Sequence, residues 1–128
     1  MISIYYTNES VEGEPGPNFY WRGTPDNFLQ LVNDLHQLGT HDGIELSFDN
    51  LKYVQTHENI KVILRSSKAG NELCNKRDLV VTMNLNKNTW RRVLDKILSV
   101  SYEKSHNYVE FDDLNLVESA NVIISSDA

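Results

Sequence analysis

The chain has 128 residues and a formal net charge of −6. Apolar residues make up 40% of it and charged residues 23%, a composition typical of one folded domain and not of a disordered or fibrous chain. No apolar run reaches the roughly 18 to 20 residues of a membrane-spanning helix, and no signal peptide is readable at the N-terminus. Cys74 is the only cysteine, which excludes an internal disulfide and favours a cytoplasmic protein. The sequence therefore predicts a single domain over residues 1–128.

Charge is distributed unevenly along the chain. Residues 1–50 contain eight acidic residues and one basic residue. Residues 51–104 contain five acidic and eleven basic residues, and residues 105–128 contain five acidic residues and no basic one. Either the acidic ends pair with the basic middle inside the fold, or the molecule carries two oppositely charged surfaces. The second alternative provides an acidic face for a basic partner.

In chain order, the predicted elements are strands separated by two helices. Alternation of apolar and polar residues indicates half-buried strands, and apolar residues three and four positions apart indicate amphipathic helices. The strands are expected at 2–7, 19–23, 44–48, 60–64, 79–85, 108–112 and 122–124, the helices at 25–38 and 87–100, and long loops at 8–18 and 66–78. Thr24 and Asn86 suit the N-caps of the two helices.

The two helices and the strands around them suggest an internal repeat. A shift of 62 residues places Thr24 on Asn86 and Phe28 on Trp90, and a shift of 63 places the segment 47–51 on 110–114. Each half, about 19–67 and 79–126, then has the order β-α-β-β. Because neither half can bury its helix face alone, the two are expected to share one core. The predicted fold class is α+β: a single, predominantly antiparallel sheet with both helices on one face.

No residue pattern specifies a catalytic or cofactor chemistry. The glycines have no phosphate-loop spacing, the four histidines have no diagnostic metal spacing, and the adjacent acids Asp112 and Asp113 suit a solvated turn. Lys87, Arg91, Arg92 and Lys96 on the second helix could contact phosphates, but the acidic chain favours a solvated helix face over nucleic-acid binding. We expect no enzyme activity, no cofactor and no metal.

Two stretches of the chain resemble a known class of proteins. They are the sequence from Trp21 to Pro25, which leads into the first helix, and the sequence from Tyr108 to Asp113 followed by the strand Val122–Ser125. They are similar to the immunity proteins of bacterial polymorphic-toxin systems, including contact-dependent inhibition. The resemblance implies that the chain binds a cognate toxin domain, often a nuclease, and blocks it without any catalytic residue of its own. The alternatives are another small inhibitor or regulator, or a small ligand-binding or enzymatic α+β domain.

The charge pattern predicts which residues would bind such a partner. A nuclease toxin carries a basic groove, which an acidic surface attracts, and exposed tyrosines beside the acids would anchor the contact. The expected partner-binding residues are Glu12, Glu14, Tyr20, Asp42, Glu45, Asp49, Tyr108, Glu110, Asp112 and Asp113. Glu45, Asp49, Glu110 and Asp112 are expected at outward positions of matching strands.

The leading strand bears on the oligomeric state. Residues 2–7 alternate apolar and polar side chains outside the repeat, and as an edge strand they could pair with another chain. We expect a monomer, with a homodimer through this edge as the alternative.

Overall fold

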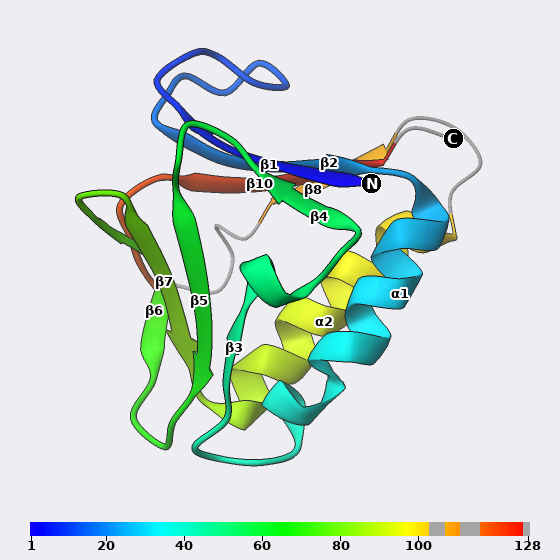
Figure 1. Cartoon of the computed structure of the whole chain (residues 1–128), viewed down its shortest axis with the longest axis vertical. Coiled ribbons are helices and arrows are strands. Elements are labelled where there is room, and N and C mark those ends of the chain that lie inside the picture. The colour runs from blue at the N-terminus through cyan, green and yellow to red at the C-terminus, as the bar shows by residue number, and fades with distance from the viewer. Residues whose placement is uncertain (103–106, 111–115, 127–128) are drawn as a thin grey trace.

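The computed structural model in Figure 1 describes residues 1–102, 107–110 and 116–126, and of residues 107–110 it describes the backbone. The described residues form an α+β fold, as the sequence predicts. In chain order the elements are β1 (Ile2–Thr7), β2 (Asn18–Gly23), α1 (Pro25–Leu35), η1 (His36–Gly39), β3 (Glu45–Ser47), η2 (Phe48–Asn50), β4 (Val54–Thr56), β5 (Lys61–Ser66), β6 (Asn71–Arg77), β7 (Val80–Leu85), α2 (Lys87–Ser101), β8 (Asn107–Glu110), β9 (Val117–Glu118) and β10 (Asn121–Ser126).

The helices begin where their capping residues predict. The Thr24 side chain accepts a hydrogen bond from the Asn27 backbone N–H at 3.2 Å, and the Asn86 side chain accepts one from Thr89 at 2.8 Å. Each cap satisfies a backbone donor that the first helical turn leaves unpaired. The first helix ends earlier than expected, because its last predicted turn is the separate 3-10 helix η1.

The prediction of a single, predominantly antiparallel sheet is wrong. The described strands form two five-stranded mixed sheets, a first sheet in the order β4-β1-β2-β10-β8 and a second sheet in the order β3-β5-β7-β6-β9. At the centre of the first sheet β10 runs parallel to β2, and at the centre of the second β5 runs parallel to β7. Alternation along a strand reveals which side chains are buried, but it contains no information on the direction of the neighbouring strand.

The two sheets have the same plan. Strands β1 to β5 correspond to β6 to β10, each to the strand five places later in the chain. Under this correspondence, the strand order of the first sheet becomes the strand order of the second sheet in reverse. Each pair of neighbouring strands also keeps its parallel or antiparallel direction. The central parallel pairs also share their register, because Asn18 lies opposite Asn121 and Val80 lies opposite Lys61 at the start of each pair. Each sheet combines three strands of one half of the chain with two strands of the other.

Two further expectations fail for related reasons. The predicted long loop at 66–78 contains β6, which a register irregularity between Glu72 and Asn75 interrupts, so its alternation is hidden in the sequence. The leading strand β1 is not an edge strand, because it lies between β4 and β2. The argument for a homodimer through that edge therefore does not hold, and a monomer stays a prediction.

Both helices lie side by side in the angle between the two sheets (Figure 1). The core there is formed by one helix face and the inner face of each sheet. Phe28 of α1 and Trp90 of α2 are fully buried. Trp21 of β2 contacts Phe48 edge-to-face, with ring centroids 5.1 Å apart. The opposite faces of the sheets, called here their outer faces, are not covered by either helix.

Trp90→Ala should lower the free energy of unfolding by roughly 3 to 5 kcal/mol, the usual cost of deleting a large buried aromatic side chain. The indole also donates its Nε1–H to the Arg65 carbonyl at 2.7 Å, and the variant leaves that carbonyl without this donor. Chemical denaturation followed by circular dichroism measures the change. Leu29→Ala, at a side chain that is 43% exposed on α1, is the control and should change stability by only about 0.5 kcal/mol. Equal effects of the two substitutions would contradict the packing described for α2.

Candidate interaction surface

Three aromatic side chains form a row across the outer face of the first sheet. Tyr5 and Tyr20 lie opposite each other on β1 and β2, with their rings stacked at 6.1 Å between centroids and 26° between planes. His57, which follows β4, stacks on Tyr5 at 4.3 Å and 12°. The neighbouring residues Ile4 and Trp21 are fully buried on the inner face, so strand alternation places the two tyrosines outward. We call His57, Tyr5 and Tyr20 the aromatic row.

Hydrogen bonds to β10 and to β1 hold the two ends of the aromatic row. The hydroxyl groups of Tyr20 and of Ser125 on β10 share a hydrogen bond of 2.8 Å. The His57 backbone N–H donates to the Ile4 carbonyl at 2.9 Å, while the ring atom Nε2 is buried without a hydrogen-bond partner among the described residues. The row thus spans the sheet from the end of β4 to β10, and stacking rather than hydrogen bonding positions the imidazole ring.

The β1–β2 hairpin follows Tyr5 on β1 and precedes Tyr20 on β2, and its connection carries three glutamates. Backbone hydrogen bonds of 3.0 and 2.8 Å join Val11 and Glu14, and the residues between them, Glu12 and Gly13, have φ values of 51° and 80°. Positive φ at both central positions is typical of a type I′ turn. The buried Asn18 side chain donates to the carbonyls of Glu9 at 2.9 Å and of Glu14 at 3.0 Å. The predicted exposed loop at 8–18 is therefore the connection of this hairpin, and hydrogen bonds of its own hold it.

A second turn, between β4 and β5, presents an acid beside the His57 end of the row. The Ile60 N–H donates to the His57 carbonyl at 3.3 Å, and Glu58 and Asn59 between them both have a φ of 60°. Glu58 is exposed and makes no hydrogen bond or ion pair among the described residues. Asparagine and glycine are the residues that tolerate this backbone conformation best, so a glutamate here is locally unfavourable.

These elements enclose a groove of about 350 Å³ on the outer face. It is lined by the two tyrosines of the aromatic row, by Glu9 and Glu58, and by Arg22 of β2, with Thr7 and Val11 completing the wall. The lining contains two carboxylates and one guanidinium, so it has a net negative charge. The groove combines aromatic rings with acidic side chains, and of the residues predicted to bind a partner it contains Tyr20.

The structure places the predicted partner-binding residues in two separate regions. Glu12, Glu14 and Tyr20 belong to the first sheet and its hairpin. Strand β8 is at the edge of the same sheet, where Tyr108 lies opposite Ser125 and Glu110 opposite Ile123; the side chains of both residues lie outside the described part of the chain. Asp112 and Asp113 also lie outside it.

Asp42, Glu45 and Asp49 form the second region, on and beside β3. All three are exposed, and in Figure 1 the loop before β3 and the β1–β2 hairpin lie at opposite ends of the molecule. Glu45 pairs with Arg65 of β5, so the acidic N-terminal part and the basic middle of the chain do neutralise each other at this point. Asp49 is not at a strand position as expected but in η2, where its N–H donates to the Ser47 hydroxyl at 3.3 Å.

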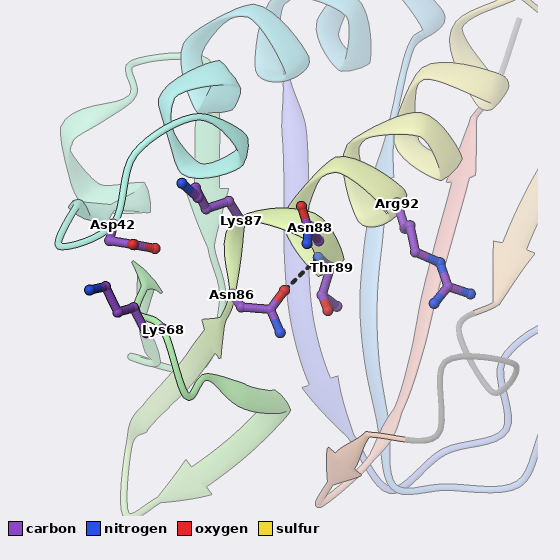
Figure 2. A pocket seen from close by; sticks show the side chains of 7 residues that line it. All are labelled: Asp42, Lys68, Asn86, Lys87, Asn88, Thr89 and Arg92. Carbon is purple, nitrogen blue, oxygen red and sulfur yellow. Dashed lines mark hydrogen bonds between the residues drawn. The ribbon is translucent and has the colours of Figure 1, made fainter.

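The basic residues of α2 surround a depression of about 420 Å³ at the start of that helix (Figure 2). Lys68 and Lys87 lie on the same side as Asp42, whereas Arg92 points away from both lysines (Figure 2). Arg91 donates its Nε–H to the Gly39 carbonyl at 2.7 Å, where η1 ends, and so serves the packing of the helices. The cations diverge and do not converge on a common point.

Sequence reasoning missed three residues of the aromatic row and its groove: Tyr5, His57 and Glu58. The alternation of residues 2–7 could have placed Tyr5 outward, but no local signal indicated that the chain after β4 returns beside β1. No group of three or more potential metal ligands occurs among the described residues. In the same part of the chain no helix is long and apolar enough to cross a membrane.

Comparisons with protein-family models, with curated proteins and with solved structures find no match to the chain. The functional argument therefore rests on the outer face of the first sheet and on the sequence.

Cys74 should not react with thiol reagents in the folded protein. Burial raises the pKa of its thiol to about 12, and the Ser119 hydroxyl, 3.8 Å from the sulfur, only partly opposes that effect. Because the thiolate is the nucleophile, less than about 0.1% of the thiol is ionised at pH 8. Titration with a chromogenic disulfide should show no fast reaction in buffer and one equivalent of reaction in denaturant. Fast reaction of the native protein would contradict the burial of this side chain.

Proposed function

We propose that the chain is a non-enzymatic immunity protein that binds a basic bacterial toxin domain, for example a nuclease, and neutralises it in the cytoplasm. The aromatic row between the glutamate-bearing turns is the observation that supports this most directly. Tyrosines supply much of the binding energy at protein interfaces, and carboxylates around them attract and orient a basic partner. The resemblance of the sequence to immunity proteins supports the identity of the partner.

We also infer that the chain is an internal duplication in which each half contains the predicted β-α-β-β unit and two further strands. The common strand order, the common register of the central strands, and the burial of Phe28 and Trp90 on equivalent helices support this inference. The duplication offers an internal comparison. At the position of the Tyr5–Tyr20 pair the second sheet has Asn75 opposite Thr82. Because two small polar residues suffice there, the fold itself does not require the aromatic pair.

The glutamate at the β4–β5 turn supports the same view. Glu58 is exposed and occupies positive φ, where an L side chain other than Asn, Asp or Gly costs roughly 1 to 2 kcal/mol. A residue that costs stability at an exposed turn is favoured by something other than folding. Attraction of a basic partner gives such a reason, since Glu58 lines the groove beside the aromatic row.

Charge reversal at the groove should slow binding to the partner. The partner is obtained by co-purification with the chain from the native host, and its toxicity is tested by expressing it alone and together with the chain. We expect the chain to restore growth. Glu9→Lys with Glu58→Lys should lower the association rate about tenfold or more, and the wild-type rate should fall as salt shortens the electrostatic range to about 8 Å at physiological ionic strength.

The matched control is Asp42→Lys with Asp49→Lys, which makes the same change in net charge at the other acidic region. Its association rate should stay within about twofold of the wild type after correction for net charge. An equal loss in the control would move the interface to β3. A partner that is not basic, or growth that the chain does not restore, would contradict the proposed function.

Glu58→Asn should change stability and binding in opposite directions. Asparagine adopts positive φ at lower cost, so the free energy of unfolding should rise by about 1 kcal/mol. Loss of the carboxylate at the edge of the groove should weaken binding to the partner. Denaturant unfolding and binding kinetics measure the two effects on one variant. A variant that is more stable and binds equally well would show that Glu58 has no part in the interface.

A further inference from the structure

The groove beside the aromatic row combines two kinds of group that recognise the same ligand chemistry. The ring of Tyr20 presents π-electrons on its face, which attract a cation placed over it, whereas Tyr5 is stacked between Tyr20 and His57. Glu9 of the hairpin and Glu58 of the β4–β5 turn contribute two carboxylates to the same lining. An aromatic face beside two carboxylates forms a receptor for an organic cation.

We infer that this groove binds the guanidinium group of an arginine side chain presented by the partner, an inference that rests on the proposed function. A guanidinium is planar, so it can stack on a tyrosine ring while its edge N–H groups donate to a carboxylate. A lysine ammonium is a compact and strongly hydrated point charge, and it cannot make both contacts with one flat group. Arginine is also the cation most enriched at the centres of protein interfaces.

The remaining lining fits this ligand better than an anion. Arg22 is the one cation among the described lining residues, against two carboxylates, so the lining keeps a net negative charge. The basic depression at the start of α2, by contrast, has three cations that point in different directions (Figure 2). It offers no common point for a phosphate or a carboxylate, and it lacks an aromatic side chain.

The second sheet again provides the comparison. Its outer face has a hollow of about 230 Å³ between Arg65, Arg77 and Thr82. That hollow contains two guanidinium groups and, in Glu72, one carboxylate, and it has no aromatic ring. An arginine ligand should therefore bind to the first sheet and not to the second, although both faces have the same strand plan.

The experiment uses the full chain and N-acetyl-arginine amide as the probe. We expect saturable chemical-shift changes of the Tyr5 and Tyr20 ring protons in the millimolar range, the affinity expected of a single side-chain contact. N-acetyl-citrulline amide has nearly the same shape without the charge and should leave these signals unchanged. N-acetyl-aspartate amide tests the opposite polarity, and its binding at the groove would overturn the inference.

Two variants make the test specific. Glu9→Gln with Glu58→Gln alters only exposed side chains, so the fold is kept, and it should weaken probe binding about tenfold. Thr82→Ser on the second sheet should have no effect. An equal response to arginine and citrulline amides, or no response to the arginine amide in a protein with a native spectrum, would overturn the inference.

The two proposals can fail separately. If the arginine probe binds in the groove but the chain neutralises no basic partner, the arginine site stands and the immunity function is refuted. Conversely, the chain could neutralise a toxin while line broadening in the complex affects other signals and not those of Tyr5 and Tyr20. That result would refute the arginine site and leave the immunity function intact.

Discussion

Neither half of this chain can complete a sheet without two strands of the other half. Strands β8 and β10 close the first sheet, and β3 and β5 open the second, so two parallel strand pairs join the halves. At these junctions the inner side chains are buried on both partners, for example Trp21 beside Ile124 and Leu64 beside Met83. The junctions therefore combine backbone hydrogen bonds with core packing, and they make the two halves one cooperative unit.

This arrangement also determines which surfaces are open to a partner. The two helices fill the angle between the sheets, so each sheet has one buried face and one outer face. Side chains on the outer faces do not contribute to the shared core, and they can differ between the sheets at little cost. They do differ: equivalent cross-strand positions carry Tyr5 with Tyr20 in one sheet and Asn75 with Thr82 in the other.

The sequence predicted local structure well and pairing poorly. Capping residues located both helix starts, and period-two alternation located β2, β5 and β7 to within about two residues. A continuous apolar run located β10 equally well, because all of these signals are local. The direction and order of strands depend on contacts between residues far apart in the chain, which alternation cannot encode. Strands β4 and β9 have only three and two residues, too few for any period to be visible.

The same limit applies to the candidate site. Tyr20 and the hairpin glutamates were expected at a binding surface from charge and composition alone. His57 could not be, because it stacks on Tyr5 only after β4 has returned to pair with β1. The acids of the N-terminal part were expected to act together, yet the loop before β3 and the β1–β2 hairpin, which carry them, lie at opposite ends of the molecule (Figure 1). Charge segregation in a sequence therefore predicts that an acidic surface exists, but topology decides which acids share it.

In the proposed interface the two kinds of residue at the groove would have separate physical roles. Glu9 and Glu58 are exposed, and charges at such positions mainly change the rate of encounter and lose their influence at high salt. Tyr5 and Tyr20 are already held by stacking on the sheet, so their rings would lose little freedom on binding and would mainly slow dissociation. A surface that combines exposed charges with ordered aromatic rings would thus select a partner first by charge and then by shape.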